Sequence, residues 1–588
     1  MYCDLLTGQE KTVVPFASHV SCTVEMVSLT KVYDVAVIDE IQMIGDEQRG
    51  SAWSRALQGI HAREIHLCGG LEACDIVRSL ATSMGDDFEL KKYDRLSNLV
   101  ISDDSLQGDY SKIRPGDCVV AFSRNDIFSI KRQIEMLTPH KCAVIYGSLP
   151  AETRSKQARL FNEEGTGFDV LVASDAIGMG LNLNIRRVIF HTTIKAVVGP
   201  KNSAVNDSGE RLSTYFVDHS SIKQIAGRAG RMSSQYKIGE VTTWQECDLN
   251  YVKAVMQYDI PQIKAAGLFP SVEQIDRFSE GLKKMNSEVV DDDDDDRTAS
   301  PRKEGETKEN KVDETKTRLS VLIEKFVELA QMDGRYFLCS HEDMVCVSNW
   351  LNPIPLSLAD RFTFAMAPVN TRNDNLMNQL YAYAATYSMQ RPVALNCRMA
   401  STVPRDIDQL TSLCDKHQVV DLYLWLSLRF PKYFIEREKA LEQKRFAVDN
   451  IQSTLKLENL GVEYSHSQAY DKMRKRCNKD HPDGLPSSAR FVAGIGDTLR
   501  ANMIANAHKK SYEFPHRSLE PSDELIEKAK RRSFMNRDRN RGGEQMRGQN
   551  NNRQHKGHHS DSEGHAARRV KENKGVDHKV AVHVKGLG

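Results

Sequence analysis

The chain has 588 residues, with 80 Lys and Arg against 80 Asp and Glu and a hydrophobic share of 40%. This length predicts three or four domains of about 150 residues each, and the lack of any run of about 18 apolar residues excludes a membrane-spanning helix. The 12 cysteines form no Cys-x-x-Cys pair, which argues against a zinc ribbon or disulfide scaffold and favours a reducing compartment. A net charge of zero would argue against a nucleic-acid partner if charge were spread evenly along the chain. The same total also results when an acidic segment and a basic segment cancel, so the distribution of charge must be considered.

Strands and helices are predicted to alternate between residues 116 and 245, and two strands are predicted before that range. The apolar run 33–40 ends in two carboxylates, as a buried parallel strand would. Further strands are predicted at 64–68, 118–122, 142–147, 169–174, 186–192 and 239–244, and helices at 125–137, 152–164 and 221–231. This alternation predicts a parallel sheet with helices on both faces.

Beyond residue 246 the pattern changes to amphipathic helices, such as 319–332 and 408–430. Two stretches lack a core-forming pattern, and we expect both to be disordered. One is 286–318, which holds six consecutive aspartates, Asp291 to Asp296. The other is the tail from 528, with 16 Lys and Arg against 6 Asp and Glu. The neutral total therefore conceals a basic segment of the kind that can bind nucleic acid.

Asp39 and Glu40 close the first predicted strand. Carboxylates at the carboxyl end of a parallel strand are well placed for a metal-bound nucleotide. In that role Asp39 would hold Mg²⁺ through water, and Glu40 would orient or deprotonate the attacking water. A surface turn explains an isolated Asp-Glu pair equally well.

Gln224, Arg228 and Arg231 have the spacing i, i+4 and i+7 and would share one face of the predicted helix 221–231. Two guanidiniums on one face suit a γ-phosphate and its transition state. The alternative is a solvated basic face. Because each glycine inside a helix costs about 1 kcal/mol, Gly227 and Gly230 favour a functional reason.

Polar loops follow several predicted strands. In the loop 173–182, Gly180 allows the backbone to approach a ligand, and Asp175 can cap or couple to the arginine segment. Ser123 and the loop 146–154 suit contacts with a phosphate backbone. Taken singly, each of these loops is explained as well by a plain turn.

One expected segment is missing from the sequence. A phosphate-binding loop, G-x-x-x-x-G-K-[ST], cradles the β- and γ-phosphates of a nucleotide with backbone N–H groups and a lysine. The 588 residues contain no such segment. A carboxylate strand without this loop cannot by itself form a competent nucleotide site.

Taken in chain order, six segments resemble motifs Ib, II, III, IV, V and VI of superfamily 2 helicases. They are TGQE (7–10), VIDEIQM (37–43), HLCGG (66–70), AFSRND (121–126), LVASDAIGMGLN (171–182) and QIAGRAGR (224–231). The amino-acid sequences of these segments most resemble those of the mitochondrial degradosome RNA helicases of the suppressor-of-Var, or Suv-three, family. The segments 333–339, 354–358 and 421–431 resemble that family's helical C-terminal region, so the likeness covers about residues 1–455.

The resemblance implies an α/β fold with two RecA-like parallel-sheet domains, the first incomplete, followed by an α-helical C-terminal domain and a disordered tail. The implied divisions are a partial first domain (1–85), a linker (86–112), a second domain (113–245), a helical domain (246–455) with the acidic insert 286–318, and a largely disordered tail (456–588) that is basic from 528.

The resemblance also implies an ATP-dependent RNA helicase, unwinding 3′-to-5′ and serving mitochondrial RNA turnover and surveillance with a 3′-to-5′ exoribonuclease. It implies Mg²⁺, with Mn²⁺ as an alternative ion, DNA as an alternative nucleic acid, and the mitochondrial matrix, with the nucleus as an alternative location. The implied catalytic residues are Glu40, Gln224, Arg228 and Arg231. Nucleotide contacts are expected from Asp39, Asp175, Gly180 and Gln224, and RNA contacts from Thr7, Gly8, Thr23, Ser123 and Thr153.

The chain departs from the family at its start, because it opens essentially at motif Ib. Family members carry the phosphate loop, motif Ia and a mitochondrial targeting segment before that point. We therefore expect a truncated sequence. The alternative is a non-catalytic RNA-binding or scaffold protein, and the upstream reading frame would distinguish the two.

Overall fold

The computed structural model describes residues 2–198, 204–205, 211–231, 235–291, 318–399, 402–457 and 578–585. Within these ranges, no helix is both long enough and apolar enough to cross a membrane. The expected α/β architecture, with parallel strands first and helices afterwards, is confirmed.

The first α/β unit is built on a four-stranded sheet in the order β4-β5-β18-β6. β4 and β5 are parallel, and Leu67 of β5 is fully buried together with Leu57 and Leu80 from the adjoining helices. The elements are β4 (Val32–Ile38), α1 (Gly50–Gly59), β5 (His61–Gly70), α2 (Cys74–Met84) and β6 (Asp87–Asp94).

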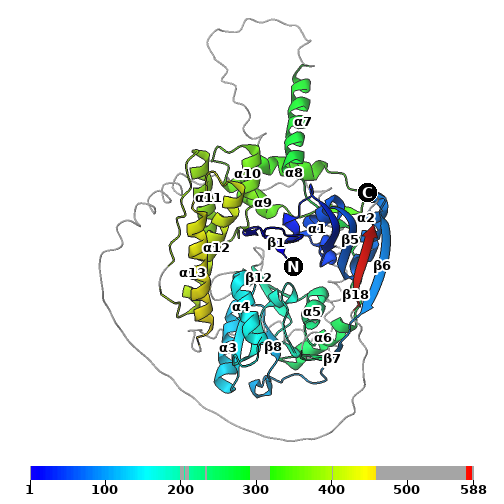
Figure 1. Cartoon of the computed structure of the whole chain (residues 1–588), viewed down its shortest axis with the longest axis vertical. Helices are drawn as coiled ribbons and strands as arrows, with labels where there is room; N and C mark the ends of the chain where they lie inside the picture. The colour runs from blue at the N-terminus through cyan, green and yellow to red at the C-terminus, as the bar shows by residue number, and fades with distance from the viewer. Residues whose placement is uncertain are drawn as a thin grey trace, which may run out of the picture. The chain divides into compact units, whose positions relative to one another are not determined.

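The strand between β5 and β6 comes from the far end of the chain. β18 (His578–Lys585) pairs antiparallel with both neighbours, as the red strand in Figure 1 shows. The expectation of a disordered tail is therefore wrong for these eight residues, because the open backbone edges of β5 and β6 supply hydrogen-bond partners on both sides. The rest of the predicted tail from 458 onward, residues 458–577 and 586–588, lies outside the described part of the chain.

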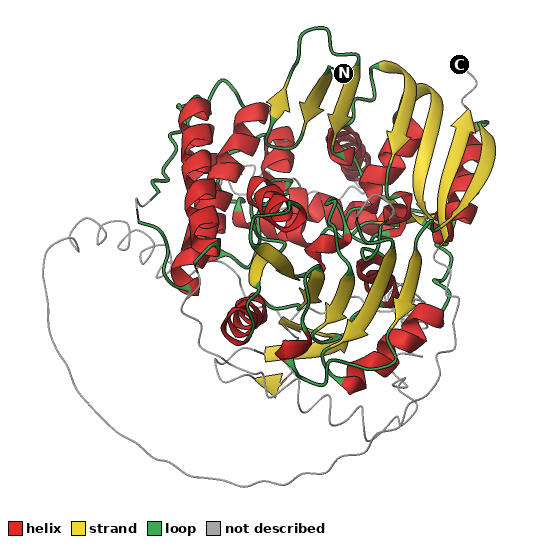
Figure 2. Ribbon diagram, turned by 60° about the horizontal axis from the view of Figure 1, so that its bottom comes forward, coloured by secondary structure: helices red, strands yellow, loops and turns green. Residues whose placement is uncertain are grey.

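The second α/β unit contains a six-stranded parallel sheet in the order β7-β15-β11-β8-β10-β9. Figure 2 draws the strands of the chain, these among them, as yellow arrows. Its strands are β7 (Asn98–Ile101), β8 (Asp117–Val120), β9 (Lys141–Ile145), β10 (Phe168–Ala173), β11 (Arg187–Phe190) and β15 (Ile238–Thr243). Its helices are α3 (Arg124–Leu137), α4 (Ala151–Asn162), α5 (His219–Ala226) and α6 (Glu246–Gln257).

Two features of these units differ from the prediction. The expected linker 86–112 contains β6 and β7, which belong to the first and second sheets respectively. A separate antiparallel sheet was also missed, made of β12 (Ile194–Val198), β13 (Ala204–Val205) and β14 (Arg211–Phe216). Short strands that pair with distant partners carry little signal in sequence periodicity.

A small sheet precedes the first unit, in the order β2-β1-β3. β1 (Cys3–Leu6) and β2 (Lys11–Thr12) form a hairpin whose turn is the segment 7–10, and β3 (His19–Cys22) pairs with the other edge of β1.

The region beyond residue 257 is mainly helical. It contains β16 (Ala266–Leu268), α7 (Val272–Asp291), α8 (Leu319–Leu329), β17 (Tyr336–Leu338), α9 (Glu342–Trp350), α10 (Leu358–Ala365), α11 (Asp374–Ser388), α12 (Ile407–Arg429) and α13 (Arg437–Leu455). α7 continues to Asp291, so the predicted disordered insert begins too early at 286. Residues 292–317 of that insert lie outside the described residues.

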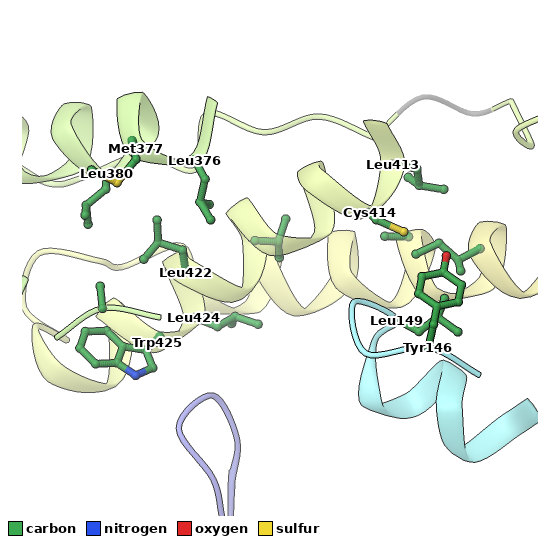
Figure 3. Close-up of a cluster of buried hydrophobic side chains, with 14 of the residues drawn as sticks. Tyr146, Leu149, Leu376, Met377, Leu380, Leu413, Cys414, Leu422, Leu424 and Trp425 are labelled. Atoms are coloured by element: carbon green, nitrogen blue, oxygen red, sulfur yellow. The ribbon is translucent and has the colours of Figure 1, made fainter. Parts of the chain in front are cut away.

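The helical region shares one hydrophobic core with the second sheet. In β8, Val119 belongs to this shared core, whereas Cys118 and Val120 belong to the core on the opposite face, as the two-residue period of a strand requires. Figure 3 shows Tyr146 and Leu149, which follow β9, facing Leu413 and Cys414 of α12. The second sheet and the helical region are therefore packed as one body.

The helical region also contacts the first unit through the parallel pair β16–β17. Ala266 is fully buried in the core of the first unit. Cys339 Sγ accepts a hydrogen bond from the Ser51 N–H at 3.3 Å, and the Ser340 N–H donates to the Glu47 carbonyl at 2.7 Å.

Replacing Leu149, which is 3% exposed, by Ala should destabilise the protein by about 2–5 kcal/mol, because it opens a cavity in the shared core. The midpoint of urea unfolding should fall in signals from both the second unit and the helical region. Leu137→Ala is the matched control: its side chain is 61% exposed, and the expected change is below about 0.5 kcal/mol. Equal midpoints for the two variants would contradict a shared core.

Candidate functional site

The carboxylates predicted at the end of β4 lie on a tight turn. β4 ends at Ile38, and Glu40 has a left-handed backbone with φ 54° and ψ 46°. The Glu40 N–H donates to Asp39 Oδ1 at 2.9 Å, and the Trp53 indole N–H donates to the Asp39 carbonyl at 3.0 Å. Left-handed backbone is uncommon for a residue other than glycine and often marks functional positions. The turn places both carboxylates at the edge of the sheet.

Gln42 connects this turn to the end of the neighbouring strand. Its Nε2 donates to Glu40 Oε2 at 2.5 Å, and its Oε1 accepts from the Gly70 N–H at 3.1 Å. A Cβ atom on Gly69 would lie 2.3 Å from Gln42 Oε1, so this position leaves no room for a side chain. Gln42 therefore fixes the orientation of Glu40, a role that the sequence analysis did not assign.

Arg228 is a buried cation, with 6% of its surface exposed. Its guanidinium donates to the carbonyl of Leu181 at 3.2 Å and to the carbonyl of Gly178. The pKa of Arg228 is lowered to about 10, chiefly by burial and also by the nearby Arg231, while Glu40 and Asp39 act in the opposite direction. The side chain stays charged at neutral pH, and its charge interacts with the carboxylates at the end of β4.

Arg231 is also subject to the field of Glu40. Burial lowers the pKa of Arg231, and Glu40 opposes this effect. Its Nη1 lies 3.4 Å from Asn182 Oδ1. Two arginines from the second unit and two carboxylates from the first therefore belong to one electrostatic site.

The prediction that Arg228 and Arg231 lie on a helix is wrong. α5 ends at Ala226, and both arginines belong to the turn that follows. Gly230 has φ 61°, and a Cβ atom there would lie 2.1 Å from the Gly239 nitrogen of β15. The glycine thus allows close packing against the second sheet, which is a structural reason for it rather than the functional one that the sequence favoured.

The other predicted nucleotide contacts have varied surroundings. Gln224 Oε1 would lie 3.3 Å from a Cβ atom on Gly178, so Gln224 faces the loop 173–182. The carbonyls of the same loop accept the hydrogen bonds of Arg228. Gly180 has φ 71°, and no described atom lies within 4 Å of where its Cβ would be. Asp175 pairs with Lys195 at 2.8 Å, which corrects its predicted coupling to the arginine segment. A direct nucleotide contact by any of them stays a prediction.

The residues predicted to contact RNA near the N-terminus lie on short turns. Thr7 Oγ1 accepts from the Glu10 N–H at 2.9 Å, which closes the turn between β1 and β2. Gly8 packs against Trp425 of α12, where an added Cβ atom would lie 3.4 Å from the indole. Thr23 is exposed and precedes a short 3₁₀ turn.

The two remaining RNA candidates belong to the second unit. Ser123 caps α3, since its hydroxyl accepts from the Asp126 N–H at 3.3 Å. Thr153 has no exposed surface, and no described group hydrogen-bonds to its hydroxyl. Contact between Thr153 and RNA would require the covering elements to move, and all these RNA contacts stay predictions.

Family profiles match four parts of the chain. The DEXQ-box helicase domain of Suv3 matches residues 1–93, and the helicase conserved C-terminal domain matches residues 91–233. Suv3 C-terminal domain 1 matches residues 347–388, and the ATP-dependent RNA helicase SUV3 C-terminal domain matches residues 410–457.

Curated relatives match most of the chain. It is 43% identical to the mitochondrial DExH-box ATP-dependent RNA helicase DExH18 of Arabidopsis thaliana, over 75% of this chain and 51% of that protein. It is 42% identical to the mitochondrial ATP-dependent RNA helicase SUPV3L1 of Homo sapiens, over 74% and 51% respectively. For the mitochondrial helicase DExH16 of Arabidopsis thaliana the identity is 41%, over 75% and 70%.

The chain thus spans about half the length of the first two of these relatives. Among solved structures, the Escherichia coli DEAH/RHA helicase HrpB is similar at a TM-score of 0.33 and 12% identity, over 72% of this chain and 51% of that one. A likeness at that level carries no argument about the site.

Replacing Gly230 by Ala should lower the melting temperature markedly. The left-handed backbone alone costs about 1–3 kcal/mol, and the added Cβ atom would clash with the backbone of Gly239. Gly281→Ala is the control, because this position is helical and open, and the change should be neutral or stabilising by up to about 1 kcal/mol. Thermal unfolding followed by circular dichroism measures both. Equal melting temperatures would refute the packing role of Gly230.

Proposed function

Because this chain belongs to the Suv3 family of ATP-dependent RNA helicases, we propose that it supplies the water-activating and arginine-bearing parts of an ATP-dependent RNA helicase. The observation that carries this proposal is the electrostatic interaction of Arg228 with Asp39 and Glu40, and of Arg231 with Glu40, which joins two separate α/β units. Closure of two such units around a nucleotide would couple hydrolysis to movement along RNA.

Each side chain has a distinct part in the proposed hydrolysis. Glu40, held by Gln42, would accept a proton from the attacking water as the water oxygen bonds to the γ-phosphorus. The bond from the γ-phosphorus to the oxygen bridging to the β-phosphate would break at the same centre, so that ADP leaves with that oxygen. Arg228 and Arg231 would stabilise the negative charge that grows on the phosphoryl oxygens, and Gln224 would help to orient the phosphates. These groups act best when water is excluded, and the partial burial of both arginines favours that condition.

The carboxylate site fits a divalent ion held mainly by nucleotide and water. No group of three metal-binding side chains occurs among the described residues, whereas Mg²⁺ commonly uses one or two carboxylates together with phosphates and waters. Asp39, which is exposed, would hold Mg²⁺ through water, and Mn²⁺ prefers similar oxygen ligands. The bound ion would neutralise phosphate charge.

The finer functions rest on the family. We infer unwinding in the 3′-to-5′ direction, cooperation with a 3′-to-5′ exoribonuclease and action in mitochondrial RNA turnover and surveillance. The relatives are mitochondrial ATP-dependent RNA helicases by name, which supports RNA as the substrate and a mitochondrial location. DNA binding and a nuclear location are secondary proposals.

Two observations favour a second candidate, an RNA-binding or scaffold protein that does not hydrolyse ATP. The 588 residues contain no phosphate-binding loop. In addition, β18 fills the position beside β5, next to the strand end that contacts Gln42. A phosphate loop carried on a strand at that position would have to displace β18.

The Glu40→Gln variant should lower the rate of RNA-stimulated ATP hydrolysis by at least about 100-fold and leave RNA binding unchanged, because only proton acceptance is lost. The assay uses the 588-residue chain and, if the upstream reading frame encodes a phosphate-binding loop, the protein extended to include it. Glu47→Gln, an exposed neighbour, is the control and should keep full activity.

Unchanged turnover in Glu40→Gln would remove Glu40 from its proposed role. RNA binding without hydrolysis in both unsubstituted proteins would favour the second candidate. An upstream reading frame without a G-x-x-x-x-G-K-[ST] segment would point the same way.

A further inference from the structure

Two arginines of the helical region lie against the turn at residues 7–10, which joins β1 to β2. Arg429 is the last residue of α12, and Arg437 is the first residue of α13. Arg429 Nη1 lies 3.4 Å from the Gly8 carbonyl, and Arg437 Nη2 lies 3.4 Å from the Gln9 carbonyl. Both guanidiniums therefore reach the turn that carries the RNA candidates Thr7 and Gly8.

Packing holds this pair in place. The Arg429 guanidinium carbon lies 3.4 Å from the centroid of the Trp425 ring, and its Nη1 also donates to the Trp425 carbonyl at 3.0 Å. Arg437 Nη1 donates to Ser427 Oγ at 2.8 Å. In Figure 3 the Trp425 indole points away from the labelled leucines and toward the pale blue N-terminal loop. Stacking on an aromatic ring orients an arginine without neutralising it.

The charge of the pair is not compensated by a carboxylate in the described ranges, since neither arginine forms an ion pair there. Burial lowers the pKa of Arg429 to about 10, so the side chain is still protonated at neutral pH. By contrast, Lys444 of α13 lies 3.0 Å from Glu152 and 3.1 Å from Asp421. A half-buried cation without a counter-ion is costly unless a ligand supplies the negative charge.

Donors remain for such a ligand. The hydrogen bonds of Arg429 to described groups use only Nη1, and those of Arg437 use Nη1 and Nη2. Nε and Nη2 of Arg429 form a two-donor edge that matches two oxygens of a phosphate. The neighbouring Thr7 hydroxyl and the backbone of the turn are groups that typically contact phosphates without reading sequence.

We propose that Arg429 and Arg437, held against the turn 7–10, bind the phosphate backbone of single-stranded RNA. This inference rests on the proposed RNA-binding function and extends the RNA path from the α/β units to the helical region. Its site is separate from the carboxylate and arginine site around Glu40, so it should operate without ATP.

The test measures binding of a fluorescent single-stranded oligouridylate to the 588-residue chain by anisotropy, over a series of salt concentrations. Arg429→Gln should weaken binding roughly tenfold or more. The slope of log K against log salt should become shallower by about 0.7 for each phosphate that the variant no longer neutralises, and more so in the double variant that adds Arg437→Gln. Arg429→Lys should recover most of the slope, because it keeps the charge.

Arg372→Gln, an exposed arginine of the same region, is the control and should leave affinity and slope unchanged. Unchanged salt slopes in folded Arg429 and Arg437 variants would overturn the proposal, even if affinity fell, because the arginines would then only position the turn. Displacement of the RNA from this site by excess ATP would assign the site to free nucleotides and also overturn it. No RNA binding by the unsubstituted chain would instead refute the proposed function itself.

Discussion

The arrangement of the site depends on the hydrophobic core that the second parallel sheet shares with the helical region. One face of the sheet contributes Val119, Val144 and Val172 to this core, and α12 contributes Leu413 and Leu422. Because a close-packed core resists sliding, α12 and α13 cannot shift relative to the sheet without opening voids between them. The ends of these helices, where Trp425 and Arg429 lie, are thereby fixed relative to the second unit.

A partly buried polar cluster crosses the same interface. Lys444 of α13 lies between Glu152 of α4 and Asp421 of α12, and the buried His417 lies beside Asp421. Burial lowers the pKa of Lys444, but Asp421 and Glu152 outweigh it, so that the pKa is raised overall. Burial lowers the pKa of His417, which favours its neutral form. Such a network adds directional constraints to an otherwise apolar contact, since a charge that is partly removed from water requires its partners in place.

The contact on the first unit is of a different kind. There β16 and β17 insert beside α1, with Gly267 so close to Cys339 and Gly50 that a Cβ atom would lie 2.6 Å from the Cys339 sulfur. The helical region thus contacts the first unit through a close approach of backbone to backbone, and it contacts the second unit through a broad hydrophobic core. The helical region therefore contacts both the unit that carries the carboxylates at the end of β4 and the unit that carries the arginines after α5. These groups from the two units form one electrostatic site.

Local sequence determined much of the fold. The apolar runs that became β8, β9 and β10 are fully buried on both faces of the sheet, so their signal does not depend on distant partners. The motif residues Asp39, Glu40, Arg228 and Arg231 were also identifiable from residue type and order.

Only the tertiary structure decided that α5 stops at Ala226, because Gly230 is required by its approach to Gly239, a contact with a strand that periodicity cannot reveal. The insertion of β18 between β5 and β6, the bridge from Gln42 to Gly70 and the two arginines against the turn 7–10 likewise arise between segments far apart in sequence. Sequence by itself therefore determined which groups are candidates for the chemistry, and long-range packing decided which of them meet.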